Sequence, residues 1–600
     1  MSDLPLFDGA AAVRAIEAQP LAHWLRGGTI PELVRGAAQR YGTRRAHRFL
    51  EAPDAAPVDQ SFAEVAARTE RIAAAFAAEA PRPVVASLLP GMPLTLPLLL
   101  GAMAAGTCLP VNPFLEPDAI LHMLTRTGAR FLLAEGPSGS QGVWEKLPAI
   151  RAALPDLTIL ICGEPEGEAG RVEDWLASHA DATPAPLPGP TDIAACFHTG
   201  GTTGLPKIAR LTHANLAYMA FLTAFGGGIR EGSTIPCGMP LFHVGGLIFG
   251  GLAPLWAGAS VVQLGRAGYR DPAMTAALWR IAAREGADIL FALPTIAIAA
   301  LDGFTAPAPP RLRHWVSSAA PLPAAANRRF TDITGLPIKE AWGLTEASLV
   351  LTFTPPGGES RPGSVGMALP WCRLALQSLS DPTRAAAPSE PGLVLAQSPG
   401  LFAGYLDQPG DGLCEAPHLG PGRWLDTGDV GQIDADGYLF LTGRAKDLIL
   451  RGGHNIDPAV IEEAFMALPE VQVAAAVGAP DARLGELPVC YVALVPGARA
   501  TPEDLATRAL PAIAERAARP RVVRVLERMP LTAVGKVDKL ALRRDAALGV
   551  LREVYPGHQM RAETRAGGRI AVALSPLPPE AALVLAGLGL DLLTDTKAKE

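Results

Sequence analysis

The chain has 600 residues, of which 49% are hydrophobic and 18% charged, so it has room for several domains of about 150 residues and ample apolar material for a large core. Its net charge of -7 provides no basic surface for a phosphate backbone, and a nucleic acid is therefore not expected as a ligand. The length and composition also exclude a short secreted or disordered protein.

The cysteines and the N-terminus indicate a cytoplasmic protein. The seven cysteines include no close pair at metal or redox spacing, which is typical of reduced thiols. Residues 1–19 mix acidic with apolar side chains and do not resemble a signal peptide. The longest apolar run, 92–110, contains Pro93, Pro97, Gly101 and Gly106, which favours a buried helix over a membrane span.

Residues 30–346 alternate between apolar strand-like runs and Ala-rich helical stretches. This alternation predicts an α/β domain of parallel-rich sheets covered by helices. A helix is expected at 94–105, and the Pro-rich stretch 164–192 is interpreted as a connector without elements of its own. Strands are expected at 84–89, 131–134, 157–162, 235–240, 287–293 and 312–318.

The pattern changes after Gly357 to short strands separated by Gly and Asp turns. We therefore expect a large domain over 1–444 whose last part, 357–444, is a β-rich subdomain. A small α+β domain is expected over 445–546, with helices at 458–468 and 503–516. Residues 547–600 are left as a tail of unknown role.

A loop rich in glycine and threonine, FHTGGTTGLPK at 197–207, follows one predicted strand. Glycines let backbone N–H groups approach a polyphosphate, hydroxyls donate to it, and an ammonium neutralises its charge. Pro206 and Ile208 flank Lys207, whereas a Walker A loop has Gly-Lys-Ser/Thr opening a helix. Thr199 occupies a position where a dinucleotide fingerprint needs glycine. The loop alone leaves the function open.

Five ordered motifs together resemble the adenylate-forming (AMP-binding) superfamily, of the acyl-CoA synthetase type. The resemblance covers about residues 30–545. It implies that ATP converts a carboxylic acid into an acyl-adenylate, which a thiol then attacks, and that the small domain moves between the two steps. The motifs are GGTTGLPK (200–207), EAWGLTEAS (340–348), DTGDVG (426–431), GRAKDLILRGGHNIDP (443–458) and PLTAVGKVDK (530–539).

The resemblance assigns site residues for ATP, Mg²⁺ and coenzyme A. Thr345 would donate to the α-phosphate, and Glu346 would bind Mg²⁺, which prefers oxygen ligands. Lys536 would bridge the substrate carboxylate and the α-phosphate. The positions expected to hold the β- and γ-phosphates are Thr199, Gly200, Gly201, Thr202, Thr203, Gly204 and Lys207. Those expected around the adenosine are Ala320, Trp342, Gly343, Asp429 and Arg444.

Three further positions follow from the same resemblance. Lys446 matches the hinge about which the small domain turns. Gly452 and Gly453 match a loop that borders the pantetheine channel, where an absent side chain leaves room. Asp429 is suited to a ribose diol, because its two oxygens can accept from both hydroxyls at once, and Arg444 at the domain junction would add a donor.

The segment MPLFHVGGLIFGG (239–251) resembles the acyl-pocket segment of the family. His243 occupies the gate position, Ala319 lies in the segment that closes the pocket, and Gly245 and Gly246 are expected to leave volume beside apolar walls. Relatives that activate amino acids carry an aspartate in this segment, and residues 242–246 contain none. An aliphatic or aryl acid is the expected substrate.

The resulting hypothesis is a cytoplasmic, AMP-forming carboxylic acid:CoA ligase of fatty acid metabolism, acting on a fatty or other hydrophobic acid. One alternative is an acyl-AMP ligase that delivers to a carrier protein. Another is a lipid-trafficking protein with vestigial catalysis. Two departures from the family pattern are Ile208, in place of a common glycine, and Gly200, in place of a frequent serine.

The Ala/Leu-rich stretch 570–593 is expected to be helical and to dock on the body of the protein. It lacks the cationic face of an interfacial anchor, which disfavours the alternative of peripheral membrane contact. An oligomer contact is the third possibility, and the oligomeric state is left open.

Overall fold

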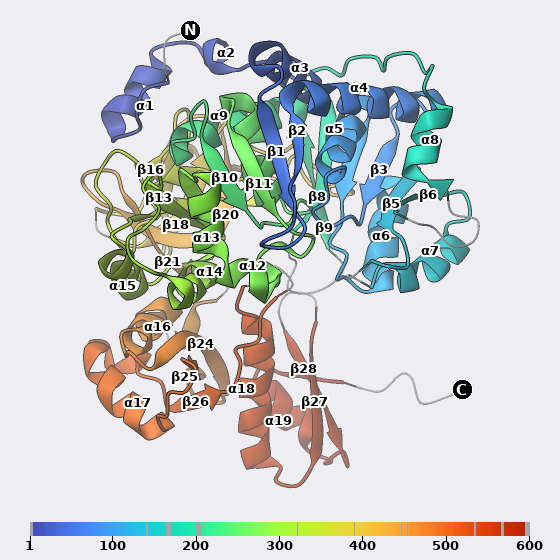
Figure 1. Cartoon of the computed structure of the whole chain (residues 1–600). Helices are drawn as coiled ribbons and strands as arrows, with labels where there is room; N and C mark the ends of the chain where they lie inside the picture. Colours follow the sequence, from blue (N-terminus) through green and yellow to red (C-terminus); the bar gives the residue numbers. More distant parts are fainter. Residues whose placement is uncertain are drawn as a thin grey trace.

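The computed structural model describes residues 4–139, 142–163, 170–199, 206–320, 322–388, 390–445, 447–452, 454–532, 536–565 and 569–593. Figure 1 shows a large upper body, with the small domain and the tail below it. Seven of the predicted site residues lie outside the described residues: Gly200, Gly201, Thr202, Thr203, Gly204, Lys446 and Gly453.

Two mostly parallel sheets form the large domain, which confirms the predicted α/β class. One has the order β7 (Gly170–Arg171), β6 (Thr158–Cys162), β5 (Phe131–Glu135), β3 (Val84–Ser87), β4 (Thr107–Pro110), β8 (Ile193–Thr199) and β9 (Lys207–Thr212). The other has the order β16 (Met367–Ala368), β15 (Thr352–Phe353), β14 (Ile338–Trp342), β13 (His314–Ser318), β12 (Ile289–Ala292), β10 (Thr234–Cys237), β11 (Ser260–Leu264), β1 (Arg45–Leu50) and β2 (Val58–Ser61). Among the described strands of these two sheets, antiparallel pairs occur only towards the edges, where β2, β15, β16 and β9 lie.

Two helices are apolar around their whole circumference and occupy the interior of the large domain. Every residue of α5 (Thr95–Ala105) is buried, as are nearly all those of α9 (His213–Gly227), so both contribute to one continuous core. The apolar run 92–110 is therefore a buried helix with its flanking segments, as predicted. No helix in the described ranges is both long and apolar enough to cross a membrane.

The other helices of the large domain lie around these sheets (Figure 1). They are α1 (Ala10–Glu17), α2 (Leu21–Trp24), α3 (Ile30–Tyr41), α4 (Phe62–Glu79), α6 (Pro117–Thr127), α7 (Leu147–Ala153), α8 (Val172–Ser178), α10 (Val244–Leu247), α11 (Ala253–Ala257), α12 (Pro272–Ala276), α13 (Leu278–Glu285), α14 (Pro294–Ala299) and α15 (Ala324–Thr334). Thr29, Ser61 and Thr212 each begin a helix with a capping box, which satisfies N–H groups that the first turn leaves unpaired.

The interpretation of 164–192 as a structureless connector is wrong, because this stretch contains β7 and α8. Trp175 of α8 packs against Phe76 and Phe131, with ring centroids 5.0 and 5.8 Å away. That tertiary contact stabilises a short helix that the local composition does not favour.

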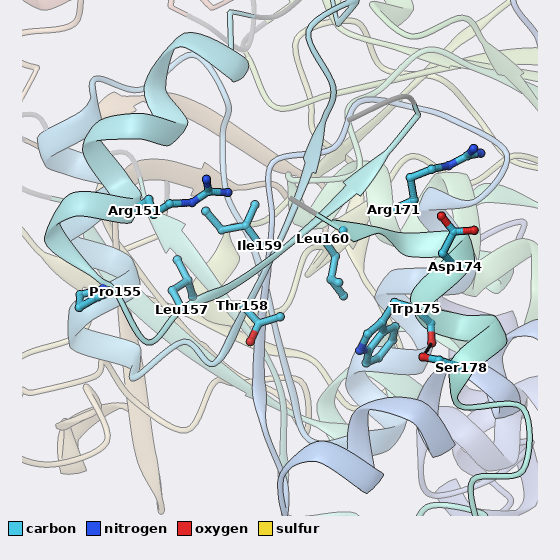
Figure 2. A pocket seen from close by; sticks show the side chains of 11 residues that line it. Arg151, Pro155, Leu157, Thr158, Ile159, Leu160, Arg171, Asp174, Trp175 and Ser178 are labelled. Atoms are coloured by element: carbon cyan, nitrogen blue, oxygen red, sulfur yellow. Dashed lines mark hydrogen bonds between the residues drawn. The ribbon is translucent and has the colours of Figure 1, made fainter. Parts of the chain in front are cut away.

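A pocket at the sheet edge opposite β9 is lined by residues of α7, β6, β7 and α8 (Figure 2). Its volume is about 710 Å³, and none of the predicted site residues lines it.

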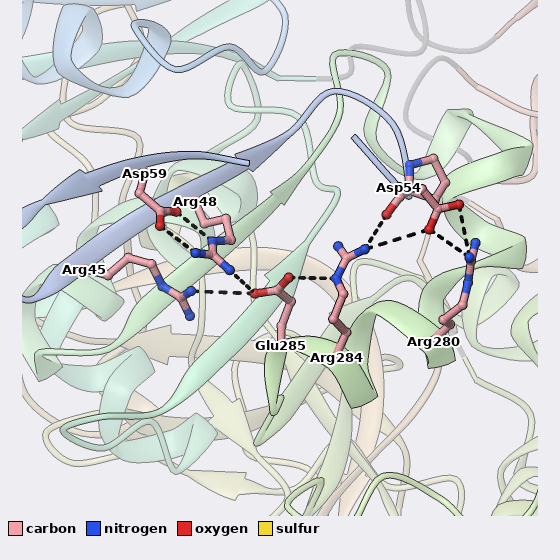
Figure 3. Close-up of polar contacts among 8 residues, drawn as sticks. Arg45, Arg48, Asp54, Asp59, Arg280, Arg284 and Glu285 are labelled. Carbon is pink, nitrogen blue, oxygen red and sulfur yellow. Dashed lines mark hydrogen bonds and ion pairs between the residues drawn. The ribbon is translucent and has the colours of Figure 1, made fainter. Parts of the chain in front are cut away.

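An ion-pair network ties the β1–β2 hairpin to helix α13 (Figure 3). Glu285, whose side chain is 5% exposed, contacts Arg48 at 2.8 Å, Arg284 at 3.0 Å and Arg45 at 3.6 Å. Arg48 also pairs with Asp59 of β2. Because the shared carboxylate is buried, this network fixes the hairpin better than isolated surface pairs would.

A five-stranded sheet in the predicted subdomain 357–444 consists of β17 (Arg373–Ser378), β18 (Gly392–Gln397), β20 (Arg423–Ile433), β19 (Cys414–Glu415) and β21 (Leu439–Arg444). The small domain contains a second five-stranded sheet of β22 (Ile449–Arg451), β23 (His454–Ile456), β24 (Val471–Asp481), β25 (Gly485–Leu494) and β26 (Val522–Leu526). Its helices are α16 (Pro458–Met466), α17 (Pro502–Ala509) and α18 (Lys539–Val554). The helix expected over 503–516 ends at Ala509, because Pro511 follows and lacks the N–H that an α-helix would need.

The tail is not one helix, as 570–593 had been expected to be. It forms β27 (Gln559–Thr564), β28 (Ile570–Ser575), α19 (Ala581–Gly587) and β29 (Asp591–Leu592), because prolines at 576, 578 and 579 interrupt the Ala/Leu-rich stretch. Val572 and Leu585 pack with Leu551 of α18 in a small separate core. Figure 1 shows the tail, in red, beside α18, and this helix runs through the boundary placed at 546.

Candidate active site

The candidate site lies at the carboxyl ends of strands from both large sheets, where open α/β sheets bind their ligands. Thr199 ends β8, and Lys207 begins β9 beside it. Ala319 and Ala320 follow β13, and the Ala319 backbone takes a left-handed φ of 74°. Strand ends that are more than a hundred residues apart in the sequence thus carry predicted site residues.

Trp342 ends β14, and the turn that follows it requires glycine. A Cβ at Gly343 would lie 1.7 Å from the carbonyl oxygen of Leu349, so no other residue fits without moving the backbone. This turn leads directly into a short helical segment that carries Thr345 and Glu346. The close contact at Gly343 therefore fixes where those two side chains begin.

Asp429, on β20 of the β-rich subdomain, is held by two hydrogen-bond donors. Trp342 donates its indole N–H to Asp429 Oδ2 at 2.9 Å, and Arg444 Nε lies 3.0 Å from Oδ1. Arg444 is the cross-strand partner of Asp429 on β21. Burial raises the pKa of the Asp429 carboxyl, and the Arg444 charge opposes that rise. Each carboxylate oxygen keeps a second acceptor site, which leaves room for a diol.

Glu346 contacts a residue that the sequence analysis did not select. The phenol of Tyr405 donates a short hydrogen bond to Glu346 Oε1. Lys207 Nζ lies over the same ring, 4.8 Å from its centroid. Tyr405 thus touches both the phosphate-loop lysine and the predicted metal-binding carboxylate. The only local signal in the sequence is a Gly-Tyr pair in a loop.

Lys536 reaches the site from the small domain. Its backbone N–H donates to Thr532 Oγ1 at 3.2 Å, and its carbonyl accepts from Thr532 N at 2.6 Å, which closes a tight hairpin. Burial and the charge of Arg444 lower the pKa of the Lys536 ammonium to about 8, while Asp429 opposes this shift. The charges of Arg444 and Asp429 therefore act on Lys536 across the domain junction.

The predicted acyl end contains two buried, neutral histidines. His243 begins α10 and accepts at Nδ1 from Gly245 N, 3.1 Å away. Burial, with the Lys536 charge, lowers the pKa of His243 to about 3, and burial lowers that of His198 to about 4. His198, which we had not selected, accepts from Asn112 N at 3.3 Å. Neither histidine is protonated at neutral pH, so His243 carries no charge into the site.

The glycines of this segment serve close packing. A Cβ at Gly246 would lie 2.0 Å from the Pro240 carbonyl oxygen, and one at Gly251 would lie 2.9 Å from Leu96. Neighbouring atoms therefore occupy the space that a side chain at either position would need. The expectation that Gly246 leaves open volume is wrong. Gly452 turns between β22 and β23 with φ 57° and donates to Leu484 O at 2.8 Å, without a contact to the nucleotide-site residues described above.

Comparison with known proteins agrees with these features. Residues 34–406 match the model of the AMP-binding enzyme family, and residues 460–536 match the AMP-binding enzyme C-terminal domain. The chain belongs to the AMP-binding enzyme family. The resemblance drawn from the five motifs is thereby confirmed.

Several relatives of this AMP-binding enzyme are CoA ligases. It is 33% identical over 572 residues to the marinolic acid–CoA ligase of Pseudoalteromonas sp., covering 90% of this chain and 85% of that protein. ATP-bound MatB from Rhodopseudomonas palustris is 26% identical, with a TM-score of 0.73 over 86% of this chain and 99% of that one. The fold also matches the anthranilate CoA ligase AuaEII in complex with anthranoyl-AMP, at 24% identity and a TM-score of 0.78 over 89% of this chain and all of that one. The enzyme is an AMP-forming CoA ligase that uses ATP and CoA.

Proposed function

We propose that this enzyme activates a hydrophobic monocarboxylic acid as its acyl-adenylate and transfers the acyl group to CoA, with Mg²⁺ bound at Glu346. The observation that carries the proposal is the Asp429–Arg444 pair, whose charges act on Lys536 of the small domain, while the Lys536 charge in turn acts on the neutral His243. This arrangement supports a reacting centre between the proposed nucleotide-binding groups and the proposed acid site.

The adenosine end uses Trp342 and Asp429. With the indole N–H and the Arg444 guanidinium each on a different oxygen, Asp429 presents its remaining lone pairs to the two ribose hydroxyls. The indole ring lies beside Gly343, at the edge of the adenine region. This arrangement orients ATP before the reaction begins, which removes part of the entropic barrier.

The residues near Glu346 fit a magnesium ion. Mg²⁺ takes one or two carboxylates together with phosphate oxygens, and retains several waters. Across the described ranges, Glu346 forms no ion pair, and no cluster of three or more His, Cys, Asp or Glu side chains could hold a metal by itself. When bound, the ion neutralises charge on the phosphates. Thr345 and Lys207 would contact the α-phosphate and the terminal phosphates.

Lys536 addresses the electrostatic problem of the first step, in which an anionic carboxylate attacks an anionic α-phosphate. A carboxylate oxygen forms a bond to phosphorus, the bond to the bridging oxygen breaks, and pyrophosphate leaves with the electron pair. An ammonium between the two anions lowers their repulsion most where charge is concentrated, at the transition state. The thiolate of CoA then attacks the acyl carbon, and AMP leaves to give the thioester.

The choice of a hydrophobic monocarboxylic acid rests on the charges near His243. Among the described residues, Lys536 is the charged group that acts on the neutral His243, and the reacting carboxylate uses it. A second carboxylate or an ammonium on the substrate would therefore have no further charged partner among the described residues there. Phe249, in the same segment as His243, stacks on Phe291 with ring centroids 3.7 Å apart, and this apolar surrounding favours a hydrophobic acid.

The decisive experiment is ATP–pyrophosphate exchange across a panel of aliphatic, aryl, dicarboxylic and amino acids, with Mg²⁺ varied. Exchange should be strongest with aliphatic or aryl monocarboxylates and should require Mg²⁺. Thioester formation is then measured with CoA and with a carrier protein that bears a free pantetheine thiol. Exchange confined to dicarboxylates or amino acids, or transfer to the carrier protein alone, would contradict the proposal.

A further inference from the structure

Residues 402–406, which none of the five motifs includes, link the chain segment of the proposed phosphate-binding Lys207 to that of the proposed metal-binding Glu346. Leu406 N donates to Ile208 O at 2.7 Å, beside Lys207 at the start of β9. At its other end, Phe402 N donates to Glu346 O at 2.9 Å. The segment therefore fixes the backbone of β9 relative to that of Glu346.

The side chain of Tyr405 makes the same link at the level of functional groups. Its hydroxyl donates to Glu346 Oε1, and its ring carries the Lys207 ammonium. Phe402 packs edge-on against the ring, with centroids 4.9 Å apart, so the phenol has little rotational freedom. One half-buried side chain therefore contacts an anion and a cation that both belong to the nucleotide site.

The chemistry of this contact leaves Glu346 free to bind a metal. An ordinary phenol is protonated at neutral pH, so the Tyr405 hydroxyl donates to the carboxylate and does not compete with it for a cation. Among the residues the structure describes, no hydrogen bond or ion pair engages Glu346 Oε2. A hydrogen bond to one oxygen of a carboxylate ligand orients the other oxygen toward the metal.

We propose that Tyr405 is a positioning residue that orients Glu346 for Mg²⁺ and holds Lys207 at the phosphate site. This inference rests on the proposed role of Glu346 in binding Mg²⁺. Tyr405 acts through the hydroxyl on the carboxylate and through the ring on the ammonium, so the two effects can be separated by substitution.

The test uses ATP binding by isothermal titration calorimetry, without an acid substrate and with Mg²⁺ varied. Tyr405→Phe removes the hydroxyl and keeps the ring. It should raise the Mg²⁺ concentration for half-maximal enhancement of ATP binding about 10- to 100-fold, because loss of a supporting hydrogen bond to a metal ligand has that typical effect. ATP affinity without metal should stay unchanged. Tyr405→Leu, which also removes the ring, should weaken ATP binding with and without Mg²⁺.

Two further variants separate positioning from a structural role. Tyr438→Phe removes a phenol that donates to Glu359 O at 3.0 Å, outside the site, and should leave the Mg²⁺ dependence unchanged. In a Glu346→Gln background, Tyr405→Phe should have no further effect on Mg²⁺ dependence. Equal Mg²⁺ dependence in wild type and Tyr405→Phe, or full additivity with Glu346→Gln, would overturn the inference while leaving the proposed function intact. ATP binding by wild type that ignores Mg²⁺ would overturn both.

Discussion

The two sides of the proposed nucleotide site are built in different ways. On the proposed adenosine side, Trp342, Asp429 and Arg444 are held by direct hydrogen bonds and by strand pairing within the large domain. On the opposite side, Lys536 stands on a short hairpin of the small domain, and the charges of Arg444 and Asp429 act on it across the domain junction. The rigid side is suited to recognition, and the side that crosses a domain boundary is suited to a group needed in only one of two steps.

The largest expected effect comes from removing the side that crosses the boundary. Lys536→Ala should lower the adenylation rate by about 10²- to 10³-fold, a typical cost of losing one electrostatic contact to the transition state. Transfer from synthetic acyl-AMP to CoA should be largely spared. Measuring the two half-reactions separately on one preparation checks this, and an equal loss in both would assign Lys536 a different role.

Glu346→Gln tests the metal-binding end of the large domain. Neutralising the carboxylate should reduce ATP–pyrophosphate exchange by about 10²-fold, because charge on the departing pyrophosphate is then less well neutralised. Saturating Mg²⁺ should not restore the rate. The exposed Glu415, which pairs with Arg423 on the surface, provides the matched control Glu415→Gln, and its exchange should equal that of wild type. Unchanged exchange in Glu346→Gln would remove Glu346 from the metal site.

The pH profile distinguishes the two sides without a mutation. The pKa of Lys536 is lowered to about 8, so the ammonium is present below that pH and is lost above it. We expect kcat/KM for ATP to fall about tenfold per pH unit above pH 8. Transfer from acyl-AMP to CoA, which does not need this ammonium, should show no such fall. An adenylation profile that is flat to pH 10 would contradict the assignment.

The smallest effect is expected on the rigid side. Trp342→Phe removes one of two donors to Asp429. A hydrogen bond to a charged group contributes about 1.5–3 kcal/mol, and because Arg444 still holds Asp429, AMP affinity should fall by the lower end of this range, about tenfold. The control is Trp424→Phe, because the buried Nε1 of Trp424 has no hydrogen-bond partner among the described residues. Calorimetric titration with AMP compares them, and equal affinities in both variants would show that the Trp342 bond does not orient Asp429.

Much of the fold followed from local patterns. The sequence predicts the strands at 131–134 and 157–162 and the helix at 94–105 within a residue or two, because buried strands and helices of a parallel sheet are continuous apolar runs. The sequence patterns do not predict helix α8 or the end of α17. Helix α8 depends on Trp175 packing against distant rings, and α17 ends because Pro511 follows it and lacks an N–H.

The sequence by itself determined which residue types the reaction uses, since phosphate, ribose and carboxylate each require a particular donor or acceptor in a recognisable motif. Only the tertiary structure decided how these residues act on one another. Trp342 donates to Asp429, 87 positions away, and Tyr405 joins Glu346 to Lys207 through one side chain. Such contacts leave no periodic trace in the chain, because they arise where strand ends of separate sheets meet and not from the spacing of neighbouring residues.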